Sequence, residues 1–210
     1  SEEGVATAAV LAAFPVERRF GLDQGFSFYD DEFCRRGGTG QNETWHDHPY
    51  ARFERPGEEV TDAALDWLRT EGVKDDSFLL WVHYFDPHSP YEPPPPFDRR
   101  FPKHPYNGEV EAMDHAIGRL LDGIAEMGLD KDTLFVAVGD HGESLGEHGL
   151  NGHGYRLYQV TLQVPMILRL DGVFEPGRRV PEPVQTVDLY PTILDYFGAE
   201  PVANIDGVSL

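Results

Sequence analysis

The sequence predicts an α/β fold with a largely parallel sheet, and three consecutive segments carry this prediction. Residues 77–85 and 133–138 are near-continuous apolar runs, typical of strands that are buried on both faces. Residues 109–127 between them are the clearest helix, because apolar side chains recur at helical spacing and Gly128 follows as a stop. This stripe consists of Val110, Met113, Ile117, Leu120, Leu121 and Ile124. A strand, a long helix and a strand in succession indicate a βαβ unit.

Three further segments continue the alternation of helix and strand. Residues 60–69 have apolar side chains at helical spacing, with Thr61 or Asp62 as the candidate cap. Residues 164–170 are predicted to form a third strand, and residues 187–197 a last helix. Ligands of such sheets bind at the carboxyl ends of the strands, so the loops that follow the strands are the first places to look for a site.

Composition excludes several classes of partner. The chain has 210 residues, enough for one domain with a real core, and we take residues 1–210 as a single domain. No apolar run approaches the roughly 20 residues of a membrane span. The net charge of −20 argues against nucleic acid and anionic membranes as partners. Either a salt-loaded cytoplasm, whose ions screen self-repulsion, or a GC-rich genome with an incidentally acidic domain would explain this charge. The absence of a signal peptide in these residues favours a cytoplasmic location.

Residues 139–154, directly after the predicted strand 133–138, are crowded with candidate ligands. They contain three carboxylates, three histidines and several glycines. Carboxylate oxygen and imidazole nitrogen bind metals, and glycine lets the backbone approach a ligand closely. A solvated polar loop is the alternative. A loop that leaves an apolar strand with the sequence Asp-His-Gly-Glu favours a functional site, with Asp140 and His141 as its first candidates.

A second polar loop, residues 86–91, follows the predicted strand 77–85. By the carboxyl-end rule we expect Asp86 and His88 to open into the same crevice as the loop 139–154. Prolines on both sides of His88 limit the movement of its backbone. Taken alone, His88 could equally be an ordinary loop histidine, and we interpret His83 as a satisfied histidine within the strand.

Taken in order, these segments resemble the sulfatase family of the alkaline-phosphatase-like superfamily. The resemblance covers nearly the whole chain, and its Asp-His-Gly-Glu and Pro-His-x-Pro-Tyr segments are specific in combination. It implies a three-layer αβα fold with a mixed, largely parallel sheet. The matching stretches are 19–26, 29–31, 81–91, 108–110, 113–114, 117–120, 140–154, 157–158, 164–167, 188–194 and 205–210.

The resemblance also implies roles for particular residues. Asp140 and His141 look like the second pair of metal ligands, for calcium first or for magnesium. Many members have asparagine where His141 stands, which leaves the identity of the metal open. His153 falls where the family places a lysine or histidine that contacts the sulfate, and His88 where it places a histidine near the leaving-group oxygen, as a general acid. Supporting roles are expected for Glu143, Glu147 and His148.

The family's nucleophile is not among these residues. It is a formylglycine made from the first residue of Cys/Ser-x-Pro-Ser/Ala-x-Arg, and no such segment occurs; Cys34, the one cysteine, lacks the proline. The paired aspartates that complete the metal site come earlier in the family pattern, and Asp30 and Asp31 belong to a different segment. We therefore expect part of a catalytic domain, lacking the nucleophile and metal-aspartate segment and the C-terminal subdomain, and inactive alone.

The implied function is metal-dependent hydrolysis of a small-molecule or carbohydrate sulfate ester by the intact parent protein. Hydrolysis of a phosphodiester or phosphonate, phosphoglycerol transfer and a non-catalytic relic are the alternatives. The missing nucleophile segment would separate the sulfatase from the phosphorus chemistries, because threonine there indicates phosphoryl transfer and Cys or Ser within the Pro/Arg pattern indicates a sulfatase. An upstream segment with the aspartate pair and the nucleophile would exclude the relic. Residues 86–91 favour the sulfatase.

Overall fold

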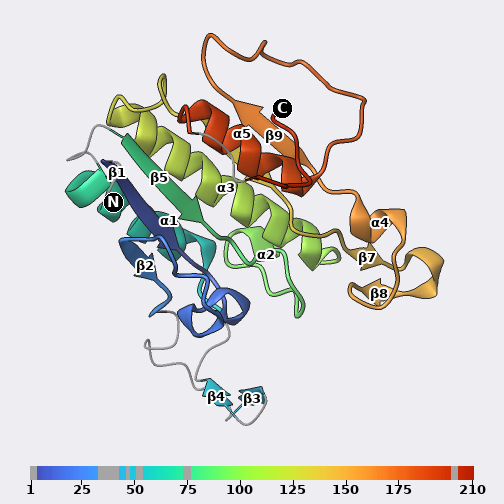
Figure 1. Cartoon of the computed structure of the whole chain (residues 1–210). Helices are drawn as coiled ribbons and strands as arrows, with labels where there is room; N and C mark the ends of the chain where they lie inside the picture. Colours follow the sequence, from blue (N-terminus) through green and yellow to red (C-terminus); the bar gives the residue numbers. More distant parts are fainter. Residues whose placement is uncertain (1–3, 33–42, 46–47, 51–53, 73–76, 200–202) are drawn as a thin grey trace. The chain divides into compact units, whose positions relative to one another are not determined.

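The computed structural model describes the chain except for residues 1–3, 33–42, 46–47, 51–53, 73–76 and 200–202. The chain forms two compact units, residues 1–130 and 131–210 (Figure 1). Cys34 lies outside the described residues. Within the described part of the chain, no helix is both long enough and apolar enough to cross a bilayer.

The first unit is built on a parallel sheet. Strand β1 lies between β2 and β5, and Val10 of β1 is opposite both Asp30 of β2 and Val82 of β5, so all three strands end at one edge. Strands β3 and β4 form a separate antiparallel pair. The elements are β1 (Val5–Val10), β2 (Phe28–Asp30), β3 (Glu43–Trp45), β4 (His48–Tyr50), α1 (Gly57–Trp67), β5 (Ser77–Val82), α2 (Phe97–Arg100) and α3 (Pro105–Glu126). Short turns of helix also occur at Phe14–Val16, Arg18–Phe20 and Leu68–Gly72.

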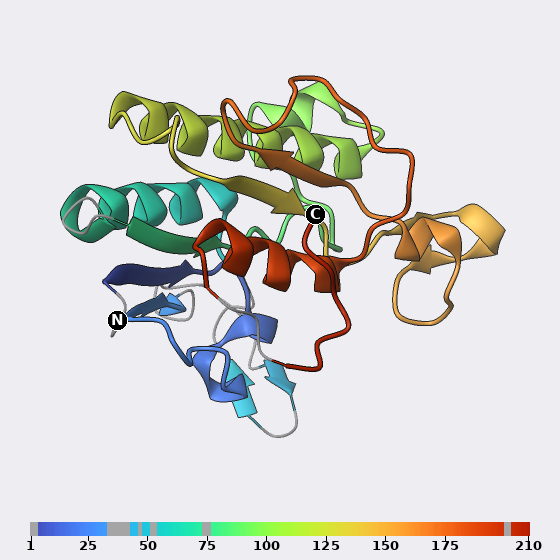
Figure 2. The same cartoon turned by 45° about the horizontal axis from the view of Figure 1, so that its top comes forward.

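Strand β1 is the buried centre of this unit. One of its faces packs with side chains of α1 and α3, and the other packs against Tyr29, Phe26 and Trp81. Figures 1 and 2 both show α1 running alongside β1 and β5, so the strand–helix–strand unit of parallel strands is β1, α1 and β5. The predicted parallel sheet is confirmed, and its described strands include β1 and β2, which we did not predict. The predicted unit of residues 77–85, 109–127 and 133–138 spans the two compact units and stays a prediction. Strand β5 is only partly buried because it lies at the edge of the three described strands.

Helix α1 begins earlier than predicted, and the proposed cap is wrong. The helix starts at Gly57, directly after Pro56, and its first turn carries the acidic residues that favour a helix N-terminus. Thr61 is fully buried within the helix, where its hydroxyl donates to the carbonyl oxygen of Ala116 at 3.0 Å. The apolar periodicity begins only at the second turn, which explains the error.

Helix α3 confirms the predicted helix and buries Leu120 and Ile124 of the predicted stripe, but the rest of its buried face differs from that stripe. The buried positions are mostly small residues, and Val110 of the predicted stripe is 37% exposed. A Cβ at Gly123 would overlap the side chain of Leu65 on α1, so the two helices approach closely because this position is glycine. Gly128 follows the helix with a φ of +74°, as predicted for a helix stop. The buried positions are Gly108, Glu109, Ala112, Ala116, Leu120, Gly123 and Ile124.

The second unit contains an antiparallel strand pair, a small hairpin and two helices. Strands β6 and β9 pair with Phe135 opposite Arg169, so the structure as a whole contains both parallel and antiparallel pairing. Strand β6 is partly exposed, unlike the strand buried on both faces that we predicted, because its sheet has only two described strands. Its pairing partner β9 is also partly exposed. The elements are β6 (Phe135–Val138), β7 (Ser144–Leu145), β8 (Asn151–Gly152), α4 (Gln159–Leu162), β9 (Met166–Arg169) and α5 (Leu189–Tyr196), with helical turns at Glu147–Gly149 and Thr186–Asp188.

Asp188 joins the start of α5 to the end of the chain. Its carboxylate accepts the backbone N–H groups of Val208 at 3.0 Å and Gln185 at 2.8 Å. These two hydrogen bonds hold the pKa of Asp188 below its ordinary value. One turn later, the hydroxyl oxygen of Thr192 accepts the N–H of Leu210 at 3.0 Å. The last residues are therefore tied to α5 through their backbone.

Candidate active site

The loop that starts at Asp140 is shaped by a close approach to α4. The N–H of Gly142 donates to the carbonyl oxygen of Thr161 at 3.0 Å. A Cβ at Gly142 would overlap the carbonyl oxygen of Val160, so only glycine fits the backbone at this distance. This contact fixes the position of the neighbouring His141.

A short hairpin returns the chain to His141. Strands β7 and β8 pair Ser144 with Gly152 and Leu145 with Asn151. At its turn, the Glu147 carboxylate accepts the N–H of Leu145 at 2.7 Å, and the imidazole of His148 stacks on Tyr158 with ring centroids 4.1 Å apart. These contacts give Glu147 and His148 structural roles in the hairpin.

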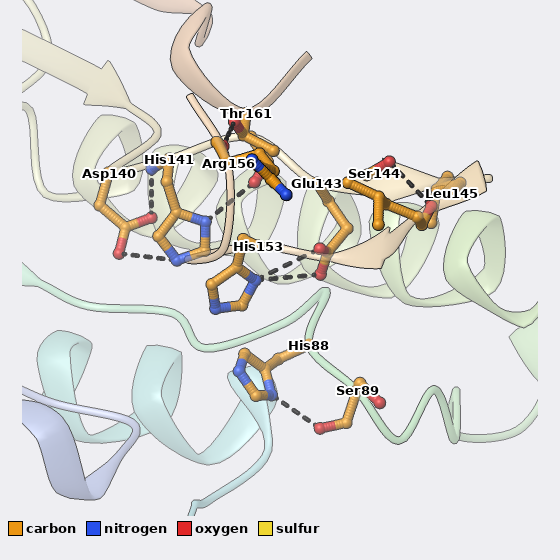
Figure 3. Close-up of polar contacts among 12 residues, drawn as sticks. His88, Ser89, Asp140, His141, Glu143, Ser144, Leu145, His153, Arg156 and Thr161 are labelled. Atoms are coloured by element: carbon orange, nitrogen blue, oxygen red, sulfur yellow. Dashed lines mark hydrogen bonds and ion pairs between the residues drawn. The ribbon is translucent and has the colours of Figure 1, made fainter. Parts of the chain in front are cut away.

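The hairpin brings His153 against His141. Their ring centroids are 3.9 Å apart and the ring planes are inclined by 30° (Figure 3). The Nδ1 atom of His153 lies 3.2 Å and 3.4 Å from the two carboxylate oxygens of Glu143, whose side chain is 8% exposed. The buried carboxylate therefore orients the His153 ring and supports a hydrogen on Nδ1.

Asp140 and His141 place an oxygen and a nitrogen side by side. Oδ1 of Asp140 accepts the N–H of His141 at 2.8 Å, and Oδ2 lies 3.7 Å from His141 Nε2. His141 Nδ1 is 3.0 Å from the carbonyl oxygen of Gly142. Because a carbonyl oxygen only accepts hydrogen bonds, Nδ1 carries the hydrogen, and Nε2 of the neutral ring has a lone pair.

This donor pair fits two positions of a metal site. A histidine that binds a metal through one nitrogen commonly donates from the other to a carbonyl oxygen, as His141 does. The side chain of Asp140 is 82% exposed and carries no hydrogen bond on Oδ2 in the described structure. Among the described residues, no group of three or more His, Cys, Asp or Glu side chains could hold a metal ion. The pair would therefore supply part of a coordination shell.

His88 belongs to the first unit. Its ring stacks on Phe85 with centroids 4.0 Å apart and planes inclined by 26°, and its Nδ1 lies 2.7 Å from the carbonyl oxygen of Ser89 (Figure 3). Both contacts restrict the direction of the imidazole. Since His88 and Asp140 lie in different compact units, the shared crevice stays a prediction.

Glu109 on α3 contacts the loop that carries His88, a role that we did not predict from the sequence. It is 3% exposed and accepts the backbone N–H groups of His88 at 3.1 Å and Glu92 at 2.6 Å. Burial raises its pKa to about 7, and the negative charges of Asp86 and Glu54 add to the effect. The sequence does contain a sign of this role, because Glu109 lies at helical spacing from Ala112 and Ala116 and so falls on the same buried face of the helix.

The acidic pair Asp30 and Asp31 is engaged by arginines. Asp30 Oδ2 is 3.0 Å from Nη1 of Arg55, which is 8% exposed, and Asp31 accepts from Nε and Nη2 of Arg18 at 2.8 to 3.0 Å. Burial raises the pKa of Asp31, but hydrogen bonds from Arg18 bring it below its ordinary value. Both carboxylates thus hold the carboxyl end of β2 in place through arginine side chains.

The sequence matches the family model described as Sulfatase over residues 20–199. It is 33% identical over 153 residues to the steryl-sulfatase of Rattus norvegicus, covering 67% of this chain and 26% of that protein. It is 34% identical over 163 residues to a low-salt glycan biosynthesis sulfotransferase of Haloferax volcanii, covering 68% of this chain and 40% of that protein. The chain thus spans about a quarter to two fifths of the length of these relatives.

Several solved structures share the fold of this chain. One is a protein in complex with its substrate, D-glucosamine-2-N,6-O-disulfate. Its TM-score is 0.74 at 17% identity, and the match covers all of this chain and 62% of that one. Another is a phosphonate monoester hydrolase from Silicibacter pomeroyi, with a TM-score of 0.74 and 20% identity, covering all of this chain and 58% of that one. The predicted fold class is confirmed.

Proposed function

The chain belongs to the sulfatase family, and we propose that it is part of a metal-dependent sulfuric ester hydrolase acting on small-molecule or carbohydrate sulfate esters. One observation carries this proposal: His141 and His153 stack beside Asp140, with each Nδ1 engaged by a fixed acceptor. Hydrolysis of a sulfate ester requires positive charge or hydrogen-bond donors at the sulfate oxygens and a proton for the leaving alcohol. Relatives named as steryl-sulfatase and N-acetylglucosamine-6-O-sulfatase support this substrate class.

Asp140 and His141 would hold the cation, through Oδ2 and Nε2. When bound, a divalent cation would polarise a sulfate oxygen and offset charge that develops in the transition state. Calcium is our first candidate because such sites are rich in carboxylate oxygen, and the imidazole of His141 keeps magnesium and other metals in consideration. The remaining ligands would come from residues beyond this pair.

His153 and His88 would have different tasks: His153 would contact the sulfate, and His88 would donate a proton to the leaving group. Glu143 accepts from Nδ1 of His153, so we assign Nε2 of His153 to a sulfate oxygen. With a hydrogen on Nδ1 already donated to Glu143, contact with an anion requires a second hydrogen on Nε2, that is, the imidazolium form of the ring. Nδ1 of His88 donates to the carbonyl oxygen of Ser89, so we assign Nε2 of His88 to the proton that the leaving oxygen receives.

The attacking group would come from outside these 210 residues, since they contain no Cys/Ser-x-Pro-Ser/Ala-x-Arg segment. We propose a formylglycine in that role. Without it, the residues described here can position a sulfate and cannot attack it.

Phosphonate or phosphodiester hydrolysis is the second candidate. The likeness to a phosphonate monoester hydrolase favours it, because that structure matches the fold as well as the disulfate complex does. The same histidines could contact a phosphonate oxygen and a leaving group. Both kinds of substrate carry one negative charge, so relative rates of turnover distinguish the two candidates.

Nitrophenyl sulfate and nitrophenyl phenylphosphonate, which share a leaving group, test the proposal on the full-length protein. We expect faster turnover of the sulfate. Faster turnover of the phosphonate would establish the second candidate, and turnover of neither would indicate a non-catalytic relic. Asp140→Ala should lower metal content and rate together. The 210-residue chain alone should show no turnover, and turnover that Asp140→Ala abolishes would overturn the view that the attacking group lies elsewhere.

A further inference from the structure

Glu109 lies beneath the loop that carries His88. We propose that Glu109 is a positioning residue, whose carboxylate ties down both ends of the segment 88–92 and thereby sets the direction of the His88 imidazole. This inference rests on the proposed role of His88 as the proton donor. It assigns no contact between Glu109 and the substrate.

The geometry is a two-point attachment by one carboxylate. Oε2 of Glu109 accepts the N–H of His88 at 3.1 Å, and Oε1 accepts the N–H of Glu92 at 2.6 Å. The glutamate is 3% exposed, so water cannot readily replace it as the acceptor. The helix approaches the loop closely, because a Cβ at the preceding Gly108 would lie 2.8 Å from Cγ of Pro93.

The attachment requires two acceptors on one side chain. An ionised carboxylate offers two oxygens and no donor, which matches two backbone N–H groups. A glutamine has one oxygen and an NH2 group, so one backbone N–H would meet another donor. Glutamine at position 109 therefore keeps the shape and removes one of the two hydrogen bonds.

The surroundings of Glu109 oppose its ionisation. Burial raises its pKa to about 7, the hydrogen bonds from Glu92 and His88 act against the rise, and the charges of Asp86 and Glu54 add to it. Burial also raises the pKa of Asp86. Glu109 thus gains a proton as the pH falls through about 7. A protonated carboxyl has one oxygen that carries hydrogen, so the loop is held at both ends above this pH and more weakly below it.

Amide hydrogen exchange on the 210-residue chain tests the attachment. At a pH above 7 we expect Glu109→Gln to accelerate exchange at His88 or Glu92 by about tenfold or more, since one buried hydrogen bond is lost. Glu126→Gln, at the exposed end of the same helix, is the control and should change neither amide. Unchanged protection of both amides in Glu109→Gln would overturn the proposal.

A second measurement needs no substitution and covers the case in which Glu109→Gln does not fold. In the unaltered chain, protection of the two amides, corrected for intrinsic exchange, should fall as the pH drops through about 7 together with the NMR titration of the Glu109 carboxyl carbon. Protection that does not follow this titration would contradict the proposal.

Kinetics of the full-length protein separate this inference from the proposed function. Glu109→Gln should slow esters with poor leaving groups more than activated esters, as His88→Ala should. If His88→Ala shows no such dependence while the amide of His88 or Glu92 still loosens in Glu109→Gln, the role of His88 fails and the attachment stands. If His88→Ala shows the dependence and Glu109→Gln does not, the positioning role is wrong.

Discussion

The imidazoles of His141 and His153 lie against one another, with ring centroids 3.9 Å apart. The hairpin of β7 and β8 separates them along the chain and brings them together in space. Each ring is also held at Nδ1, His141 by the carbonyl oxygen of Gly142 and His153 by the carboxylate of Glu143. The backbone of residues 140–153 therefore positions two side chains that have different proposed tasks. A change in that backbone should displace both rings.

Gly142→Ala should disturb this site without touching either ring. Its new Cβ would overlap the carbonyl oxygen of Val160, so the loop or α4 must move. Overpacking of this kind typically costs about 1–3 kcal/mol, which thermal unfolding would measure. Gly118→Ala is the matched control, because nothing lies within 4 Å of a Cβ there, and it should leave the stability unchanged or raise it slightly. Equal stabilities of the two variants would contradict the close approach.

Asp188→Asn should loosen the end of the chain in a pH-dependent way. The pKa of Asp188 is held below its ordinary value by the N–H groups of Val208 and Gln185. A carboxyl with a lowered folded-state pKa stabilises the fold above its unfolded pKa of about 3.9, and this stabilisation is lost as the pH falls through the folded value. The free energies of unfolding of Asp188→Asn and the unaltered chain, measured across the acid range, should therefore converge at low pH. A difference that persists at low pH would rule out ionisation of Asp188 as the cause. Asp195→Asn is the control and should lower the stability less than Asp188→Asn at neutral pH.

Glu109 should give the free energy of unfolding the opposite dependence on pH. Its folded-state pKa is raised from 4.5 to about 7, so the folded protein binds more protons than the unfolded chain between these values. The free energy of unfolding should therefore fall as the pH rises from about 4.5 to about 7, by at most about 3 kcal/mol. Glu109→Gln should remove this contribution, and Glu126→Gln should retain it. Identical pH profiles of Glu109→Gln and the unaltered chain would show that burial of this carboxyl carries no such cost.

Salt tests the origin of the net charge of −20. If the acidity is an adaptation to high salt, raising KCl from dilute to molar should raise the melting temperature, because ions screen repulsion between carboxylates. Sucrose is the control, since it strengthens burial without screening charge. A flat or falling melting temperature in KCl would support an incidentally acidic domain.

The strongest sequence signals gave the right elements. The helices α3 and α5 follow from apolar side chains at helical spacing, and the strands β5, β6 and β9 follow from short apolar runs. Strand β1 was missed, because Val5–Val10 is rich in alanine, which is a poor strand former. Strand β1 is central because it pairs with β2 on one side and β5 on the other, and the sequence of β1 alone does not reveal these partners.

The site could be predicted where its residues follow one another along the chain. Asp140 and His141 stand out by sequence, and their side chains are adjacent in the structure. Glu109 could not be predicted in the same way, because its partners are backbone N–H groups of a distant loop. The need for glycine at position 142 likewise depends on how closely α4 approaches. Such roles arise from tertiary contacts between segments.

The division of labour between His88 and His153 is the central claim, and a leaving-group series tests it most directly. The rates of His88→Ala and His153→Ala in the full-length protein would be measured with sulfate esters ranging from an activated nitrophenol to an alkyl alcohol. We predict that His88→Ala loses about 10² to 10⁴ in rate with the alkyl ester and much less with the nitrophenyl ester, which needs little protonation. His153→Ala should slow all esters alike, because it contacts the sulfate. If His88→Ala is as damaging with the nitrophenyl ester as with the alkyl ester, His88 is not the general acid.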